Sequence, residues 1–459
     1  MRYHEVAERL LAASRADHTV VIVSATSSLN TRWARSELTT NGHAETADAT
    51  VVAFHDGPAG AQVASIARPL VGLDEQALCD EALTQAKLSP PAWDAEPLPD
   101  RTSAPAGSWA TPPAPMASAE LGPALAQLGV EMATDASAAM EHFGYLEHAR
   151  TSTWLATSAG LALRHDQPEA RMEMTVKSHR RSRSTWQGFS GNDLGDVDIP
   201  GMADRARLEL SWQERRLDVA PGRRTAILSP SAVADLMIDL LYGADARAAA
   251  EGRSAFSRPD GGTAIGGSLS QRPLRLYSDP AMPGRQGAPF LRAAMSHDSA
   301  SVFDNGLGLQ PTDWVADGKL AALVSSRAVA RRTGVPLALQ PDNLALTAAG
   351  TGGLDDLVAR TQDGLLITTT WYNRMLDPQQ HLITGLTRDG VYLVRGGEVA
   401  GAVGNFRFNE SPVQLLGRIQ DAATPVPALG REMADYFTRT TMPALAVADF
   451  NFASASEAI

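Results

Sequence analysis

The chain has 459 residues, of which 44% are hydrophobic and 20% charged, so it is long enough for two or three domains with substantial cores. Forty basic and 52 acidic residues give a formal net charge of -12, which argues against a broad nucleic-acid or anionic-membrane surface. The single cysteine, Cys79, excludes an internal disulfide and a cysteine-based zinc cluster.

The first 88 residues predict a small α/β domain. Residues 4–16 have the pattern of an amphipathic helix, and their mixed charges differ from an export signal. No apolar stretch reaches the ~18 residues of a membrane span, so we expect a cytoplasmic protein. The remaining elements of this domain are strands expected at 18–26, 28–36, 45–57 and 59–70, a break at the turn-prone Thr40, Asn41 and Gly42, and a helix at 73–87.

Prolines mark the next segment, residues 89–118, as a linker or an extended arm. They stand at positions 90, 91, 97, 99, 105, 112, 113 and 115, a density that neither a helix nor a central strand tolerates. A middle α+β segment is expected at 119–225. It begins with a helix near 131–143 and continues with an alternating stretch at 145–178, which is typical of antiparallel strands.

Residues 226–459 predict a large, mostly antiparallel β domain with one or two helices, so the whole chain belongs to the α+β class. Ser229 and Pro230 suit the start of a helix, and apolar residues from Val233 to Leu241 follow the 3.6-residue period, which predicts one buried face. Asp235 and Asp239 interrupt this stripe. They are expected to face solvent, and the alternative is a catalytic carboxylate pair.

Four segments, in order, resemble the TldD/PmbA (modulator of gyrase) metallopeptidase family across most of the chain. They are RWARSELTTNG at 32–42, LSPSAVADLMIDLLYGADARAAAEGRSAF at 228–256, LYSDPAMPGRQGAPF at 276–290, and the long run from ITTTWYN to GNFRF at 367–408. The resemblance implies that the C-terminal β domain is barrel-like. The second segment is similar to the TldE-type version of the family.

Active TldD-type relatives carry an HExxxH motif on the helix after the middle domain and a further cysteine ligand near the C-terminus. Here residues 229–251 contain no histidine, and residues 417–459 contain neither histidine nor cysteine. Carboxylates alone make a poor zinc site. The resemblance therefore implies a TldE-type subunit without a cofactor of its own, which pairs with a zinc-bearing TldD-type HExxxH subunit as a heterodimer for proteolysis of unfolded peptides.

A β-rich wall suits such a substrate, because an extended peptide can add to a sheet edge through main-chain hydrogen bonds. We expect peptide contacts on two strands of the C-terminal domain, at Thr370, Trp371, Tyr372, Thr384 and Arg388. Two alternatives remain open. One is a non-proteolytic regulatory binding protein; the other is an active metallopeptidase with a relocated metal site at His297, Asp298 and Asp304, residues that otherwise belong to a polar loop.

Other polar motifs give weaker signals. His142 and His148 are two residues too far apart for an HxxEH motif, so we expect ordinary surface histidines. The basic run at 177–183 indicates a solvated strand face or a partner contact. The glycine pairs at 261–268 lack a phosphate-loop lysine and indicate a flexible loop, and GFSGN lacks the spacing of a serine hydrolase.

Overall fold

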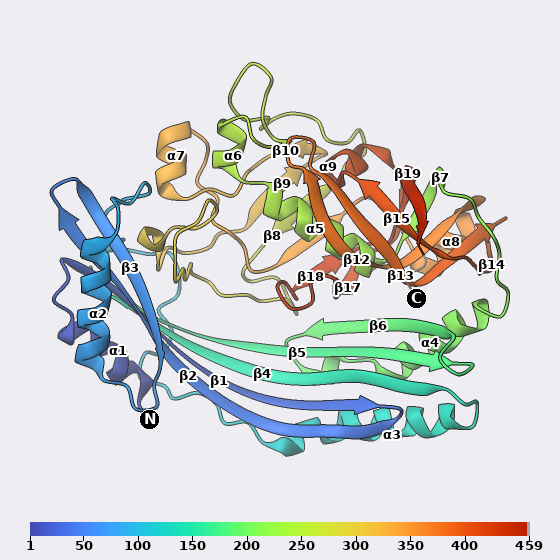
Figure 1. Ribbon diagram of the computed structural model, residues 1–459, viewed down its shortest axis with the longest axis horizontal. Coiled ribbons are helices and arrows are strands. Elements are labelled where there is room, and N and C mark those ends of the chain that lie inside the picture. The colour runs from blue at the N-terminus through green and yellow to red at the C-terminus, as the bar shows by residue number, and fades with distance from the viewer. Residues whose placement is uncertain (457–459) are drawn as a thin grey trace.

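The computed structural model describes residues 1–456, and a long curved sheet is its first main feature (Figure 1). Six antiparallel strands follow the order β3-β2-β1-β4-β5-β6. Their bounds are β1 (His18–Ala34), β2 (Glu37–Gly57), β3 (Gly60–Pro69), β4 (Glu141–Thr157), β5 (Ala162–Ser178) and β6 (Arg183–Gly191). The segments 1–88 and 119–225, which the sequence analysis separated, thus share one sheet through the pairing of β1 with β4.

The first hairpin of this sheet differs from the sequence expectation. Residues 18–34 form one strand instead of two, and the chain turns at Arg35 and Ser36, not at 40–42. Both turn residues have positive φ (56° and 60°), as a tight two-residue hairpin turn requires. Asn41 and Gly42 lie inside β2, where they pair with β1, because a long ladder outweighs their local turn preference.

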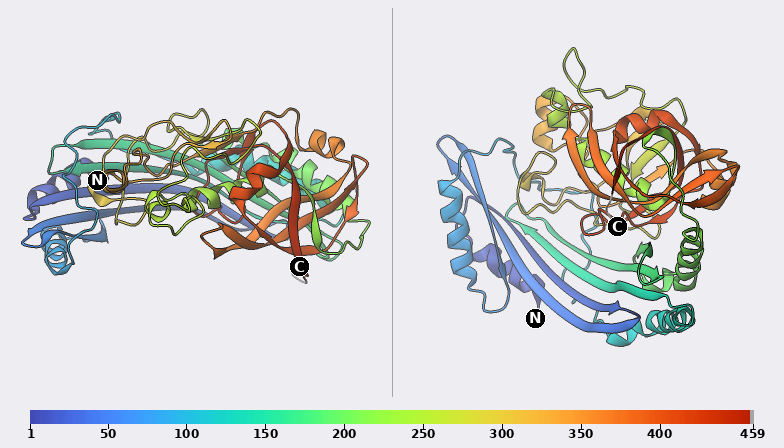
Figure 2. Two further views of the ribbon diagram at one scale, coloured as in Figure 1. Left: turned by 90° about the horizontal axis from the view of Figure 1, so that it is seen from above. Right: turned by 45° about the vertical axis from the view of Figure 1, so that its right-hand side comes forward.

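Helices cover one face of the curved sheet (Figure 2). They are α1 (Tyr3–Ala13), α2 (Glu75–Leu88), α3 (Gly122–Ala136) and α4 (Ile199–Trp212). Val21 packs with α1 and α2, and Leu29 packs with α3 and α4, whereas Ile22 points to the opposite face and packs against the C-terminal part. The helix expected at 131–143 begins and ends earlier, because β4 starts at Glu141.

The proline-rich segment 89–118 is an extended arm that lies against the curved sheet. The amide of Ala92 donates to the carbonyl of Ala61 at 2.7 Å, and the amide of Arg164 donates to the carbonyl of Ala106 at 2.8 Å. The hydroxyl of Ser301 donates to the buried carboxylate of Asp94 at 2.6 Å. The arm therefore connects the sheet with the C-terminal part, and it ends at the short helix η1 (Ser118–Leu121).

Five strands of the C-terminal part close into a barrel, in the order β12-β7-β19-β15-β13 and back to β12. They are β7 (Gly222–Leu228), β12 (Asp363–Asp377), β13 (Leu382–Arg395), β15 (Asn405–Glu410) and β19 (Leu445–Ser456), extended by β14 (Glu398–Ala402) and β16 (Ile419–Ala422). Most pairings are antiparallel, and β12 with β7 is parallel. The predicted α+β class with a barrel-like C-terminal domain is confirmed.

A second sheet and short helices complete this part of the chain. The sheet consists of β10 (Lys319–Leu320), β9 (Thr312–Ala316), β8 (Arg275–Ser278), β11 (Leu344–Thr347), β18 (Thr440–Met442) and β17 (Val426–Ala428), in that order. The helices are α5 (Pro230–Gly243), α6 (Ala246–Ala250), α7 (Arg327–Thr333), α8 (Leu354–Arg360), α9 (Pro412–Leu415), η2 (Leu194–Asp196), η3 (Val302–Asp304) and η4 (Leu416–Arg418). In the described chain, no helix is long and apolar enough to cross a bilayer.

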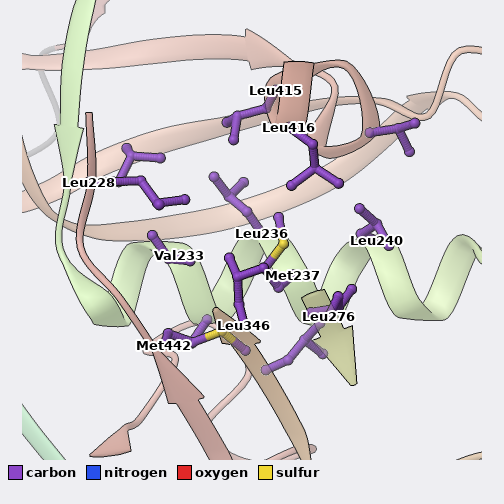
Figure 3. Close-up of a cluster of buried hydrophobic side chains, with 14 of the residues drawn as sticks. Leu228, Val233, Leu236, Met237, Leu240, Leu276, Leu346, Leu415, Leu416 and Met442 are labelled. Atoms are coloured by element: carbon purple, nitrogen blue, oxygen red, sulfur yellow. The ribbon is translucent and has the colours of Figure 1, made fainter. Parts of the chain in front are cut away.

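Helix α5 lies in the middle of the largest hydrophobic core (Figure 3). As predicted, it starts at Pro230 after Ser229, whose hydroxyl accepts from the amide of Ala232 at 3.2 Å. Leucines of the barrel and of the second sheet surround it, and every residue from Ala232 to Ile238 is buried. The expectation of one buried face is therefore wrong: α5 has two layers around it and only a short exposed surface.

Candidate functional site

The carboxylate of Asp235 is buried at the centre of the candidate site. Its side chain projects from α5 and is fully covered, so the expected solvent-facing position is wrong. Oδ2 accepts from the hydroxyl of Thr370 at 2.9 Å, and Oδ1 accepts from the amides of Glu432 and Met433 at 3.0 and 3.1 Å. Burial raises the pKa of Asp235 to about 7, although these hydrogen bonds oppose the rise.

This carboxylate holds the loop 430–436 against the barrel. Gly430 approaches so closely that a Cβ there would stand 2.5 Å from Oδ1 of Asp235. The other side of the loop meets β12: the carboxylate of Glu432 accepts from the amide of Tyr372 at 2.8 Å and from Arg374 at 2.8 Å. Asp235 therefore fixes the outer end of β12 through a loop almost 200 residues further along the chain.

Trp371 and Tyr372 form an exposed aromatic surface on this end of β12. Their exposed fractions are 37% and 52%, which is high for large apolar side chains. The guanidinium of Arg431 lies 5.4 Å from the ring centroid of Trp371, and that of Arg374 lies 4.2 Å from the ring centroid of Tyr372. Tyr372 has a φ of 57°, which turns the backbone at this point.

The five residues expected to contact peptide all lie on the hairpin of β12 and β13, but in different environments. Thr370 is buried beneath the surface and holds Asp235. Thr384 donates to the carbonyl of Phe408 at 3.1 Å, within the barrel wall. Trp371, Tyr372 and Arg388 reach the surface, and Arg388 lies 5.8 Å from the Trp371 ring. Peptide binding at these positions stays a prediction.

The edge strand of the curved sheet, β6, faces the C-terminal part (Figure 1). Three clefts follow this strand. The first has a volume of about 610 Å³ and is lined by Arg183 and Tyr392. The second, of about 280 Å³, lies between Trp186 and Ser231 at the start of α5. The third, of about 590 Å³, is lined by Phe189. Together they border the strand along its length.

The second cleft has a buried acid in its wall. Glu209 of α4 accepts from the side-chain amide Nε2 of Gln187 at 3.0 Å and from Arg205 at 2.8 Å, and it also accepts from the hydroxyl of Thr185. Burial raises the pKa of Glu209, against the opposing effect of Arg205. Glu209 was not predicted as a site residue, although it follows Ala206 by three positions and thus falls on the buried stripe of α4.

The donor atoms of α5 do not fit the zinc site that the sequence resemblance implies for active relatives. The hydroxyl of Ser231 donates to the carbonyl of Leu429 at 2.7 Å, and both oxygens of Asp235 already accept hydrogen bonds. Asp239 lies 3.3 Å from Nε2 of His381, which leaves one carboxylate and one imidazole. Zinc sites ordinarily combine three or four such ligands. In residues 1–456 we find no group of three or more suitable side chains.

The relocated metal site considered from the sequence is not assembled. Asp304 is buried and accepts from Arg327 at 2.6 Å, whereas Asp298 lies in an exposed loop and accepts from Arg247 at 3.1 Å. His297 pairs with Ala300 in a tight turn of that loop. The two carboxylates are thus each engaged with a different arginine, and the polar-loop interpretation describes residues 297 and 298 correctly.

The structure also differs from the expectations for His142, His148 and the basic run at 177–183. His142 and His148 lie on β4 and are buried, so they are not surface histidines. The period-2 alternation of β4 turns both histidines toward the helical layer, where Nε2 of His142 lies 2.7 Å from Asp135 of α3 and Nδ1 of His148 lies 3.5 Å from Glu120 of η1. The basic run is not a strand face: residues 179–181 form the turn between β5 and β6, with φ between 50° and 70°.

Comparisons with known proteins agree with this architecture. The family described as PmbA/TldA metallopeptidase C-terminal domain matches residues 221–454, just over half of the chain. Among curated protein sequences, none matches significantly.

Solved structures match over nearly the whole length. TldE from Thermococcus kodakarensis is 15% identical with a TM-score of 0.76, covering 97% of this chain and 99% of its own. A candidate modulator of DNA gyrase from Bacteroides thetaiotaomicron is 12% identical (TM-score 0.77; 98% of each chain). Another from Thermotoga maritima is 14% identical (TM-score 0.77; 98% and 99%). At these identities the likeness establishes the fold.

Proposed function

Because the chain belongs to the PmbA/TldD metallopeptidase family, we propose that it is a metal-free, TldE-type subunit of a cytoplasmic peptidase. In this proposal it pairs with a zinc-bearing, TldD-type subunit, and the pair degrades unfolded peptides. The partner supplies zinc and the activated water. The present chain supplies part of the enclosure and holds the substrate.

The observation that carries the proposal is the state of α5. This helix occupies the centre of the C-terminal core, yet Asp235, its one fully buried carboxylate, is used to fix the loop 430–436. Thr370 and two backbone amides occupy three of the about four acceptor sites of this carboxylate, so little of it is left to bind a cation. In the proposal this helix therefore stabilises the fold, and the activation of water is assigned to the partner subunit.

Strand β6 supports the peptide-handling part of the proposal. It is the last strand of its sheet, so its outer backbone groups lie outside the ladder, and the three clefts border it. An extended peptide can add to such an edge with little dependence on its sequence. The side chain of Gln213 already bonds both backbone groups of Ser184 in the manner of a neighbouring strand, at 3.2 and 2.8 Å.

The test is to purify this chain alone, a zinc-bearing TldD-type subunit alone, and the two mixed. We expect the mixture to give a complex with one copy of each, one zinc ion per complex, and cleavage of an unfolded peptide at least about tenfold faster than either chain alone. This chain alone should contain zinc far below one ion per molecule and should not cleave.

A partner whose HExxxH glutamate is replaced by glutamine serves as the matched control, because it should assemble but not cleave. Stoichiometric zinc together with cleavage in the present chain alone would contradict the proposal. So would the absence of a complex at micromolar concentrations of both chains.

A further inference from the structure

Arg285 is a buried cation without a carboxylate partner. The residue follows β8 in a loop and is only 4% exposed. Its Nε donates to the carbonyl of Thr440 at 3.2 Å, and its Nη1 donates to the carbonyl of Gly284 at 2.9 Å. Across the described residues, no acceptor lies within hydrogen-bond distance of Nη2, and no carboxylate lies within 4 Å of the guanidinium.

The neighbouring Arg439 shows how this protein usually treats a buried guanidinium. Arg439 is 9% exposed and pairs with Glu169 at 3.0 Å and with Asp342 at 3.3 Å. Burying an unpaired charge costs free energy, so charged groups in protein interiors are normally paired. Burial lowers the pKa of Arg285 to about 10, which still leaves it charged at neutral pH. The fold therefore keeps a positive charge here that makes no ion pair, although the charge of Asp196 acts on it from beyond contact distance and partly opposes the lowering of its pKa.

That charge lies at the wall of the third cleft beside β6. The cleft has a volume of about 590 Å³, within the usual range for small-ligand sites. Its lining is mainly apolar, with contributions from Phe189, Met202, Pro283 and Pro427. Its charged residues are Arg285 and the acids Asp196 and Asp198, so Arg285 is the one cationic donor in a mainly apolar lining. Such a donor is suited to a ligand that has an anionic group attached to an apolar group.

We propose that Arg285 binds a carboxylate whose attached apolar group fills this cleft, and that the natural ligand is the C-terminal residue of a peptide. Nη2 and the second hydrogen of Nη1 form the planar fork that matches a carboxylate. The cleft begins at Gly188 and Phe189, at the end of the strand that the other clefts border, so a peptide along β6 would end here. This inference deepens the proposed function, on which its choice of a peptide rests.

Two acids that also line the cleft disfavour ligands with more than one negative charge. Asp196 and Asp198 also line the cleft, and Asp198 is partly engaged because it accepts from the amide of Gly201 at 2.9 Å. Both carboxylates repel a dianion such as phosphate more strongly than a monoanion. A peptide carboxylate therefore fits the local charge better than a phosphorylated ligand.

Binding to the full chain alone, without any partner subunit, tests the inference separately from proteolysis. The probes are acetyl-Ala-Ala-Leu with a free C-terminal carboxylate, the same peptide as its C-terminal amide, and N-acetylleucine, all measured by calorimetry. We expect the free acid to bind at least about tenfold tighter than the amide. Arg285→Met should remove this preference, whereas Arg258→Met, which changes an exposed arginine, should keep it.

A stability measurement distinguishes a binding role from a structural one. Because Arg285→Met removes an unpaired buried charge, it should unfold at the same temperature as the parent or higher. Arg285→Lys keeps the charge without the fork, so its preference for the acid should be intermediate. Tighter binding of the tripeptide than of N-acetylleucine assigns the site to peptide ends, and equal binding assigns it to small carboxylic acids. Equal affinity of the parent for acid and amide would overturn the inference.

Discussion

Two buried carboxylates, in different regions of the molecule, are held by different kinds of hydrogen-bond partner. Asp135 lies in the helical layer on the curved sheet, between His142 at 2.7 Å and Arg207 at 2.7 Å. Asp235 lies in the C-terminal core and is held only by neutral donors, a hydroxyl and two amides. Both residues are at most 2% exposed, so burial alone cannot explain how they differ.

The pKa values show what the partners do. Burial raises the pKa of Asp135, but hydrogen bonds from His142 and Arg207 and the charge of Arg207 outweigh it and leave the pKa below its usual value. At Asp235 the effect of burial is larger than the opposing effect of the hydrogen bonds, and the pKa rises to about 7. Hydrogen bonds from neutral groups fix the geometry of a buried carboxylate, whereas a nearby cation also stabilises its charge.

The largest loss of stability is expected when Arg207 is removed from the hydrogen-bond network around Asp135. Arg207→Ala leaves the buried carboxylate of Asp135 and the half-buried carboxylate of Glu131 without their guanidinium, so the protein should lose about 3 kcal/mol of unfolding free energy at pH 7. Urea denaturation, monitored by far-ultraviolet circular dichroism, measures this loss of unfolding free energy.

The matched control is Arg181→Ala, which removes an exposed arginine paired with the half-buried Glu141 and should leave the urea midpoint unchanged. If both variants unfold at the parent's midpoint, the Asp135 network does not stabilise the helical layer.

The stability that depends on Asp235 and its hydrogen-bond donors should instead vary with pH. Between its unfolded value of 3.8 and about 7, Asp235 keeps its proton in the folded state and loses it in the unfolded state. Its contribution to stability is therefore complete below pH 3.8 and is lost as the pH rises to about 7. Asp235→Asn cannot titrate, and its amide can still accept from Glu432 and Met433 and donate to Thr370.

The stability of Asp235→Asn relative to the parent should therefore increase by about 2 to 3 kcal/mol between pH 5 and pH 8. Urea denaturation at several pH values measures the difference. Asp135→Asn is the informative comparison, because the lowered pKa of Asp135 contributes stability that is lost only as the pH falls below 3.8, so its difference from the parent should not change between pH 5 and pH 8. For Asp235→Asn, a difference that does not change with pH would show that Asp235 is ionised when folded.

These networks also show how far the sequence could predict the structure. The start of α5 at Pro230 and the barrel-like domain followed from capping, periodicity and resemblance. The burial of Asp235 did not, because its donors come from residues 370, 432 and 433, far along the chain. A period of 3.6 residues separates buried from exposed positions only when a helix has a solvent face, and α5 is enclosed by two layers.

The same limit applies to the curved sheet and to the clefts. Alternation predicted strands, but β1 and β4 are joined by long-range pairing that neither segment encodes alone. Arg285 stands in a loop with no periodic pattern, and only the burial of its surroundings distinguishes it from the other arginines. By contrast, Trp371 and Tyr372 lie in a segment that was predicted as a strand with peptide contacts. Their exposure is consistent with a surface role.

The smallest effect is expected from removing one neutral donor of Asp235. Thr370→Val keeps the shape of the side chain but deletes the hydroxyl that donates to Oδ2, so the folded protein should lose about 1 kcal/mol at pH 8. The loss should be smaller at pH 5, because the protonated carboxyl needs this donor less. Thr384→Val is the control: its hydroxyl donates to the carbonyl of Phe408, which does not titrate, so its cost should be the same at both pH values. Equal costs at pH 5 and pH 8 for Thr370→Val would mean that the hydroxyl does not stabilise the charged carboxylate.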